Sequence, residues 1–236
     1  MRPKQRMLIP VLAALTALTG AVHSPHGQAA GPGRMPAADA SVVPLPRPRL
    51  TGTISVEAAL TARRSIRSFS DGALGMDELS QLLWAGQGIT LGRGLRTAPS
   101  AGALYPLVLY VAAGNVASLP AGIYRYEPAG HRLVAIVGGD KRSELAEAAR
   151  GQSAVRTAAI VIAVMADYQR TTVKYGERGV RYVHLEAGHA AQNIALQATA
   201  LGLGTVMIGA FSDVAVSALL KVSGKQPLYL IPVGRK

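Results

Sequence analysis

The feature that most constrains the fold is a continuous apolar run, AAIVIAVMADY, at residues 158–168. It is rich in β-branched side chains and shows no polar alternation, so we expect a strand that is buried on both faces. Helical and strand patterns alternate around it, interrupted by one β-hairpin. This order predicts an α/β (α+β) fold, a three-layer sandwich with a mixed central sheet flanked by helices.

Capping residues and apolar periodicity place the other elements. Ser55 is a candidate N-cap for a helix over residues 56–64, and residues 75–89 form a second amphipathic helix with Leu79, Leu82, Leu83 and Gly86 inward. A long helix follows Lys174 and Tyr175. The remaining elements are predicted by range: strands at 107–113, 122–128, 132–139, 205–211 and 227–234, and helices at 141–151 and 212–222.

The N-terminus is predicted to be a separate segment. Residues 1–30 combine a basic start, an apolar stretch and small residues before Ala29 and Ala30, which is typical of a secretory signal peptide. Residues 31–50 are rich in Pro and Gly and are predicted to be a linker before a single domain at 51–236. We expect export to the periplasm or outside, or membrane anchoring through the N-terminal segment if cleavage fails.

Composition excludes several classes of function. The chain of 236 residues has no cysteine, which rules out disulfides, thiolate metal sites and a cysteine nucleophile. The net charge is +12, but no stripe of Lys and Arg with interleaved aromatic residues indicates nucleic-acid binding. His184 and His189 are five residues apart, about 140° around a helix, so they do not form a metal pair. No nucleophile elbow or P-loop is present.

Three segments carry candidate chemistry, each with a plainer alternative. Arg63, Arg64, Ser65 and Arg67 lie where a helix gives way to an extended stretch, and such a fork of guanidinium groups around a hydroxyl suits a phosphate. The alternative is a solvated basic patch at a helix C-terminus.

The other two segments are a loop and a dipeptide. The loop APSAGALYP, residues 98–106, is small enough to bring backbone close to a planar ligand, or it is an ordinary turn before a strand. Lys174 and Tyr175 can hold and relay protons as a general base does, or they form a surface dipeptide before the long helix.

Taken together, the motifs RRSIRSF, APSAGALYP, KYGERGVRYVHLEAGHAAQNIALQA and LGLGTVMIGAF followed by PLYLIPVGR resemble the nitroreductase superfamily of flavin enzymes. More narrowly, they resemble its SagB/ThcOx-type dehydrogenases, from about Val56 to the C-terminus. The resemblance implies FMN bound at the interface of an intertwined homodimer. It also implies hydride transfer through flavin N5, with dehydrogenation of an azoline-type ring in a modified peptide or small molecule.

The resemblance also implies roles for residues at matching positions. Arg63, Ser65 and Arg67, with Arg64 in the same motif, would hold the phosphate and ribityl chain. Pro99, Ser100 and Ala101 would approach the flavin from the partner subunit. Gly209 and Ala210 would lie near N5, and Arg235 would add a contact to the phosphate. Lys174 and Tyr175 would be catalytic, and no metal is expected.

Two other functions remain open on the sequence. One is an NAD(P)H-dependent reductase of nitro compounds or quinones. The other is a flavin-binding protein without catalysis. An exported protein that adheres to anionic surfaces through its positive charge is a third reading, which requires no chromophore at all.

Overall fold

The computed structural model describes residues 41–236. The predicted signal peptide, residues 1–30, and residues 31–40 of the predicted linker lie outside the described residues. Residues 39–236 form one compact unit. Among the described helices, none has the length and apolar character needed to cross a membrane.

A seven-stranded sheet forms the centre of the fold, in the order β1-β6-β5-β4-β7-β9-β8. The strands are β1 (Val42–Pro44), β4 (Leu107–Ala113), β5 (Gly122–Glu127), β6 (Arg132–Gly138), β7 (Ile160–Ala166), β8 (Leu203–Thr205) and β9 (Gln226–Arg235). Each pair of neighbouring strands is antiparallel. Among the described residues, one isolated parallel bridge joins the sheet to another segment: Ser65 pairs with Thr205 of β8.

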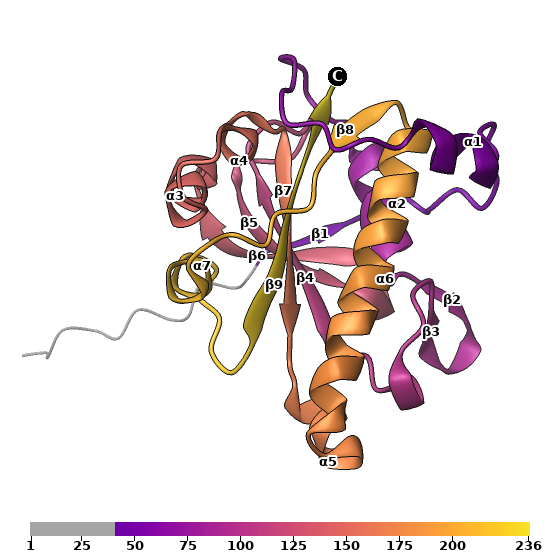
Figure 1. The fold of residues 1–236 in the computed structure, drawn as a ribbon. Helices are drawn as coiled ribbons and strands as arrows, with labels where there is room; N and C mark the ends of the chain where they lie inside the picture. Colours follow the sequence, from indigo (N-terminus) through magenta and orange to yellow (C-terminus); the bar gives the residue numbers. More distant parts are fainter. Residues whose placement is uncertain (1–40) are drawn as a thin grey trace, which may run out of the picture. The chain divides into compact units, whose positions relative to one another are not determined.

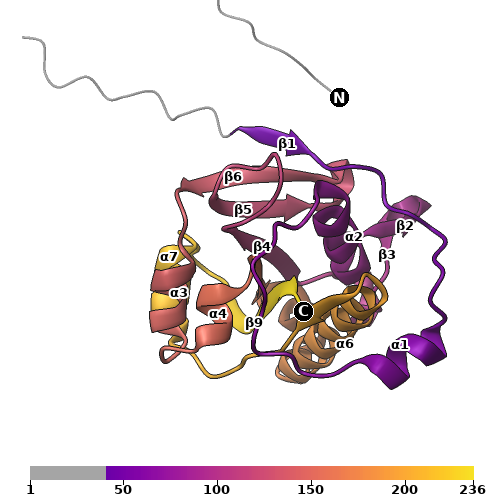
Figure 2. The ribbon, with the colours of Figure 1, turned by 90° about the horizontal axis from the view of Figure 1, so that it is seen from above.

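Helices cover both faces of the sheet, which confirms the predicted three-layer sandwich (Figures 1 and 2). On one face lie α2 (Met76–Gln87) and α6 (Arg178–Ala200), with α1 (Val56–Ala62) against α6. On the other face lie α3 (Arg142–Ala148), α4 (Ser153–Thr157) and α7 (Asp213–Leu219). A small hairpin of β2 (Ile89–Leu91) and β3 (Leu95–Arg96) follows α2, and α5 (Gln169–Tyr175) precedes α6. The turns η1 (Gly92–Gly94), η2 (Ala101–Ala103) and η3 (Pro128–Gly130) complete the chain.

Strand β7 is buried on both faces, as its apolar run predicts. Its residues alternate between two cores: Ile160 and Ile162 enter the core beneath α2 and α6, and Val161 and Met165 enter the core beneath α3, α4 and α7. The two-residue period of a strand therefore explains why every side chain of the run had to be apolar.

The linker prediction is wrong at its C-terminal end. Within the predicted linker 31–50, Val42–Pro44 form edge strand β1, which pairs with β6, and Leu45 is buried. Pro44 is compatible with this position because an edge strand has free N–H positions on its outer side. Proline content alone therefore did not distinguish a tether from an edge strand.

The bounds of α1 and of the strand predicted at 205–211 also differ from the sequence prediction. Helix α1 is capped by the Ser55 side chain as expected, but it ends at Ala62, and Arg63 is already extended. The strand predicted at 205–211 is interrupted: β8 ends at Thr205, and only an isolated bridge from Ile208 follows. The register with β9 places Pro232 opposite the gap, and proline has no N–H to donate to a ladder.

Candidate functional site

The arginine-rich segment after α1 lies against the ends of β8 and β9. The backbone N–H of Ile66 donates to the carbonyl of Thr205 at 3.0 Å, and that of Ser70 donates to the carbonyl of Arg235 at 3.1 Å. Residues 63–70 therefore run as an extended stretch beside the end of the sheet, as the sequence predicted.

Two glycines let this segment approach the sheet closely. A Cβ added at Gly204 would lie 2.8 Å from Cγ2 of Ile66, and one at Gly234 would lie 2.9 Å from the ring of Phe69. Both distances are too short for a real Cβ, so only glycine accommodates these side chains. The path of the arginine segment is thus fixed by residues far away in the sequence.

The arginines of this segment have different surroundings. The Arg64 guanidinium donates to the carbonyls of Thr61 at 2.9 Å and Arg63 at 2.7 Å, so it caps the C-terminus of α1. Within residues 41–236, the side chains of Arg63 and Arg67 make no hydrogen bond or ion pair. Arg63 and Arg67, with the exposed Ser65 between them, therefore remain able to bind an anion.

Arg235 is already paired within the chain. Its guanidinium donates to both carboxylate oxygens of Glu78 at 2.7 Å and to the carbonyl of Ala73 at 3.0 Å. Glu78 also accepts from the N–H of Gly75, the N-cap residue of α2. This bidentate pair ties the C-terminal strand to α2, so the geometry gives Arg235 a structural role beside the predicted phosphate contact.

The second group lies around the loop 98–106. The Ser100 hydroxyl accepts from the backbone N–H of Tyr105 at 2.9 Å and so closes a tight turn. Inside it, Gly102, Ala103 and Tyr105 have φ of 62°, 53° and 47°. Left-handed backbone is costly for residues other than glycine, and strain of this kind often accompanies a functional site.

This turn packs directly against the Lys-Tyr pair. A Cβ added at Gly102 would lie 2.8 Å from the Tyr175 hydroxyl and 3.0 Å from Nζ of Lys174. The Tyr175 ring packs edge-to-face on Tyr182, with ring centroids 5.1 Å apart. Tertiary structure therefore brings together two motifs that are far apart in the sequence, and the absent side chain at Gly102 leaves the space that the Lys174 amine and the Tyr175 hydroxyl occupy.

A residue that the sequence analysis did not select completes this group. Glu186 of α6 is only 2% exposed and lies near the Ser100 hydroxyl, Arg96 and Gln87. Burial raises the pKa of its carboxyl to about 7, although Ser100, the Arg96 charge and Gln87 each lower it in part. The sequence could have pointed to Glu186, because it is a lone acidic residue on the apolar face of the long helix.

Gly209 and Ala210 belong to neither group. Both are exposed, and a Cβ added at Gly209 would meet no atom within 4 Å. The Ala210 carbonyl accepts a hydrogen bond from the side chain of Gln152 at 3.2 Å. Packing within this chain therefore does not require a glycine at 209, and the backbone there is open to a ligand or a partner.

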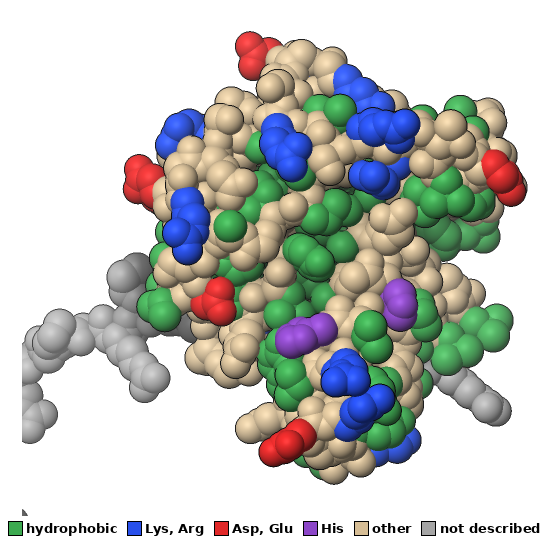
Figure 3. Space-filling model, in the orientation of Figure 1, with side chains coloured by type: hydrophobic (Ala, Val, Ile, Leu, Met, Phe, Trp, Pro, Cys, Tyr) green, Lys and Arg blue, Asp and Glu red, His purple; other side chains and the backbone are tan. Residues whose placement is uncertain are grey.

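The two groups lie toward opposite ends of α6. Lys174 and Tyr175 precede this helix, whereas Thr205, which holds the arginine segment, follows it. With 23 residues, α6 spans about 35 Å. Figure 3 shows Lys and Arg side chains gathered near the β8 and α1 end and again at the α5 end. One copy of the chain therefore does not assemble the predicted residues around one point.

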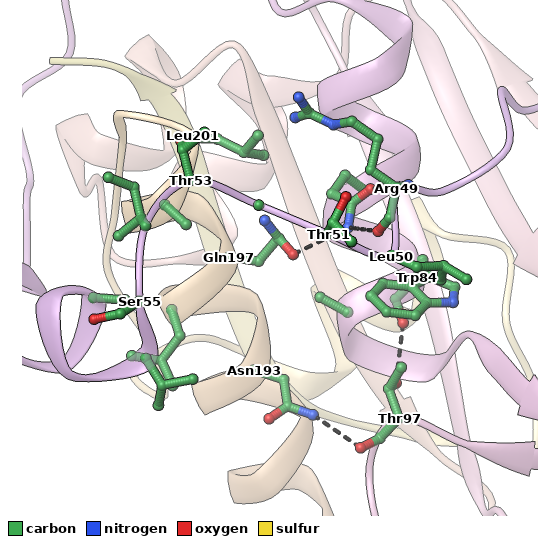
Figure 4. A pocket seen from close by; sticks show the side chains of 18 residues that line it. Arg49, Leu50, Thr51, Thr53, Ser55, Trp84, Thr97, Asn193, Gln197 and Leu201 are labelled. Atoms are coloured by element: carbon green, nitrogen blue, oxygen red, sulfur yellow. Dashed lines mark hydrogen bonds between the residues drawn. The ribbon is translucent and has the colours of Figure 1, made fainter.

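A cavity of about 380 Å³ lies elsewhere, between the segment 49–56, α1, α2 and the C-terminal half of α6. Gln197 and Gln81 hydrogen-bond across one side at 3.1 Å, and Asn193 donates to the Thr97 carbonyl at 3.3 Å (Figure 4). None of the predicted site residues lines it. Its outer rim carries the exposed apolar side chains of Leu50 and Ile54.

His184 of the long helix makes a contact with the residue before α5. The ring of His184 hydrogen-bonds to the Tyr168 hydroxyl at 2.6 Å. In the part of the chain that the structure describes, no three His, Asp or Glu side chains cluster in a way that could hold a metal ion.

Comparison with known proteins identifies relatives over most of the domain. The model of the nitroreductase family matches residues 60–235. A protein of Methanocaldococcus jannaschii that is named as a nitroreductase is 48% identical over 183 residues, which cover 78% of this chain and 92% of that protein.

Two other relatives are longer than this chain. The trifolitoxin operon protein TfxC of Rhizobium leguminosarum bv. trifolii is 28% identical over 74% of this chain and 54% of its own length. The crystal structure of a protein from Anabaena variabilis, also named as a nitroreductase, superposes with a TM-score of 0.69 at 33% identity. That match covers 76% of this chain and 38% of the Anabaena protein.

Proposed function

We propose that this chain, which belongs to the nitroreductase family, is an FMN-dependent oxidoreductase that acts as a homodimer. Members of the family are in general flavin-dependent oxidoreductases. The observation that carries the proposal is the contact of Gly102 with the Lys174 amine and the Tyr175 hydroxyl. It joins a flat, small-residue turn to two groups that can hold a proton.

The residues of this structure fit FMN in three respects. Arg63 and Arg67 have no partner among the described residues and suit a dianionic phosphate. The turn 98–106 consists largely of small residues, which allow backbone to approach a flat ring. The backbone at Gly209 is open as well. Arg235 fits less directly, because a phosphate would share it with Glu78.

The chain's own residues suit a dehydrogenation. FMN, when bound, would accept a hydride at N5. Lys174 or Tyr175 would take the proton from the carbon next to the one that loses hydride, so that a C=C bond forms between these two carbons in the ring of the substrate. Tyr182 packs on the Tyr175 ring, and the absent side chain at Gly102 leaves room for the Tyr175 hydroxyl and the Lys174 amine.

The separation of the two groups along α6 supports the proposed homodimer. A second copy, turned so that its 98–106 loop faces the arginine segment of the first, would complete one site from two chains. Exposed apolar side chains on α1 and the segment before it support such an interface: Leu50, Ile54, Val56 and Leu60. The cavity of Figure 4 lies beneath this surface.

For the substrate, we propose an azoline-type ring in a peptide or small molecule. The Lys-Tyr pair beside the turn supports this choice, because removal of a proton is needed for dehydrogenation. Reduction of a nitro compound or quinone by NAD(P)H is the second candidate. It is favoured by the 48% identical relative, which is named as a nitroreductase. A flavin-binding protein without turnover is the remaining alternative.

The first test is the visible spectrum of the purified chain and its flavin content after acid release. We expect close to one FMN per chain in the wild type. When both Arg63 and Arg67 are changed to Ala, we expect the loss of FMN together with the loss of dimerisation. A colourless protein that FMN does not reconstitute would refute the proposal.

A second test separates the candidate reactions. Anaerobic addition of NADPH or NADH should bleach the bound flavin rapidly if the chain is a reductase, whereas a synthetic thiazoline should bleach it if the chain is a dehydrogenase. Lys174→Ala should abolish only the thiazoline reaction while flavin stays bound. Unchanged turnover in that variant would remove Lys174 from the mechanism.

We also propose that the protein is exported. This rests on the signal-like residues 1–30 alone. The intact mass of the protein recovered from the cell envelope or medium should correspond to a chain that begins after Ala29 or Ala30. Recovery only from the cytoplasm, at full mass, would contradict export.

A further inference from the structure

Glu186 is the most deeply buried charged group of the described residues and is not used by the proposed reaction. It projects from the face of α6 that packs on the sheet and lies beside the turn that begins at Ser100. A carboxyl group is rarely left inside a core without a specific partner. Its position therefore needs an explanation.

The surroundings of Glu186 come from three elements. Arg96 of β3 donates to Oε1 of Gln87, at the end of α2, at 2.5 Å. Ser100 precedes η2. Three buried polar atoms in this cluster have no hydrogen-bond partner in the described part of the chain: Oε1 of Glu186, Nε2 of Gln87 and Nε of Arg96. An acceptor and two donors thus remain available around one carboxyl group.

Ser100 can link this cluster to the turn. Its oxygen already accepts the N–H of Tyr105, so its own O–H is left to donate, and Glu186 is the acidic acceptor beside it. The turn also receives support from Arg170, which donates to the Tyr105 carbonyl at 2.9 Å. The Arg96 guanidinium lies 4.5 Å from the centre of the Tyr105 ring.

A strained turn needs such external support. Ala103 and Tyr105 both have left-handed φ, which is unfavourable for residues other than glycine. Gly102, between Ser100 and these two residues, is the point of contact with Lys174 and Tyr175. A shift of the turn would therefore move the backbone that borders both proton-holding groups.

We propose that Glu186 is a positioning residue: through the Ser100 hydroxyl it holds the turn Ser100–Tyr105 against Lys174 and Tyr175. The consequence for catalysis rests on the proposed function, but the geometric claim does not. In this role Glu186 acts through the turn, by way of Ser100, and not as a catalytic residue.

The closed turn should depend on pH. Burial raises the pKa of Glu186 to about 7, so a closed turn favours the protonated carboxyl, and ionisation favours opening toward water. The other groups that face this cluster are Arg96, Gln87 and Ser100 directly, with Tyr105, Tyr126 and Arg170 around Arg96. Hydrogen exchange of residues 100–105, corrected for intrinsic rates, should therefore accelerate as pH rises through about 7.

Hydrogen-exchange mass spectrometry of the full chain, with and without FMN, tests the proposal through a cycle of variants. Glu186→Leu should accelerate exchange in residues 100–105 by about threefold to tenfold, the worth of one hydrogen bond. Ser100→Ala should accelerate it further, because it also removes the acceptor of the Tyr105 N–H. The double variant should show no acceleration beyond that of Ser100→Ala, because Glu186 is proposed to act only through the Ser100 hydroxyl. Glu186→Gln, which stays neutral and keeps the acceptor, should hold the turn closed and abolish the pH step.

Glu177→Gln is the matched control, because it makes the same change at an exposed position next to α6. It should leave both the exchange rate and the pH step unchanged. A second readout is the rate at which an amine-selective acylating reagent modifies Lys174, with Lys221 as reference. It should change in Glu186→Leu and return to the wild-type value in Glu186→Gln.

Additive effects of Glu186→Leu and Ser100→Ala, or a pH step that persists in Glu186→Gln, would overturn the inference. These outcomes are independent of the proposed function, which fails instead if the protein binds no flavin. If the protein bound no FMN but showed the coupled exchange, the positioning role of Glu186 would be supported and the proposed enzymatic function would be refuted.

Discussion

At the residue scale, the site depends on what is missing from Gly102 as much as on what Lys174 and Tyr175 provide. A side chain at 102 would occupy the space in which the amine and the hydroxyl lie. The same position has φ of 62°, so glycine is favoured there for backbone and for steric reasons at once. These two effects are separable by mutation.

Gly102→Ala should displace Lys174 and Tyr175, whereas Gly94→Ala should not. Both glycines have left-handed φ, 62° and 76°, so each change should cost about 1 kcal/mol of stability. Only at Gly102 would the new Cβ meet side chains, since nothing lies within 4 Å at Gly94. Urea unfolding measures the loss of stability that both variants share. The rate of flavin reduction by substrate measures the loss of activity that we expect only in Gly102→Ala. Equal activity in the two variants would contradict the role of Gly102.

Glu186 should make the stability of the protein depend on pH. Its folded pKa of about 7 exceeds the ordinary value of 4.5, so between these values the folded chain retains a proton that the unfolded chain has released. The contribution of Glu186 to the free energy of unfolding is therefore at its maximum below pH 4.5 and falls as the pH rises to about 7. The whole loss is at most about 3 kcal/mol.

Glu186→Gln should remove this slope. In urea unfolding, the free energy of unfolding of the variant, relative to that of the wild type, should be higher at pH 8 than at pH 5. Glu177→Gln, at an exposed position, should follow the wild type at both values. An unchanged pH slope in Glu186→Gln would mean that Glu186 is not the group that titrates.

At the element scale, the arginine segment gets its path from the strands beside it. Residues 63–70 form no strand of their own, yet their N–H groups bind the carbonyls at the ends of β8 and β9. Because glycines 204 and 234 leave room for Ile66 and Phe69, the segment lies flat on the sheet, and its arginines are presented to solvent. A loop alone would not hold Arg63 and Arg67 in a fixed relation.

Gly204→Ala should therefore weaken both the fold and the anion site. The new Cβ would lie 2.8 Å from Cγ2 of Ile66, an overpacking that costs about 1–3 kcal/mol. FMN affinity, measured by fluorescence titration, should fall with it. Ile66→Ala in the same chain should recover part of the loss, since it removes the atom nearest to the new Cβ. No recovery in the double variant would place the defect elsewhere.

At the scale of the whole molecule, the outer surface of α1 is unusually apolar. Val56 and Leu60 are four residues apart and are 65% and 51% exposed, while Ala59 packs inward. A short helix with apolar side chains on both sides suits an interface better than water. This surface is where we expect the second copy to bind.

Leu60→Glu should convert the dimer to a monomer and release FMN, because each site would need both copies. Val214→Glu is the matched control: Val214 is 81% exposed on α7, on the opposite face of the sheet. Light scattering after size exclusion, together with the flavin spectrum, measures both effects. A Leu60→Glu variant that stays dimeric with bound flavin would exclude this surface as the interface.

The sequence by itself determined most of the longer elements and their layers, because side-chain periodicity is a local property, whereas the short elements β1, β2, β3, α4 and α5 were not predicted. The run at 158–168 could only be a two-sided strand, and Ser55 and the leucines of α2 fixed a cap and a buried face. It also supplied the family motifs, and with them Lys174, Tyr175 and the arginines. Where local patterns were ambiguous, as at β1 and after β8, partner strands decided the outcome.

Only the tertiary structure decided which of these motifs meet. The contact of Gly102 with Lys174 and Tyr175, the pairing of Arg235 with Glu78 and the burial of Glu186 all join residues that are distant in sequence. No local pattern encodes such distances, since they depend on how the sheet and α6 place separate segments in space. The same placement divides the predicted site residues along α6, which is why we infer a second copy.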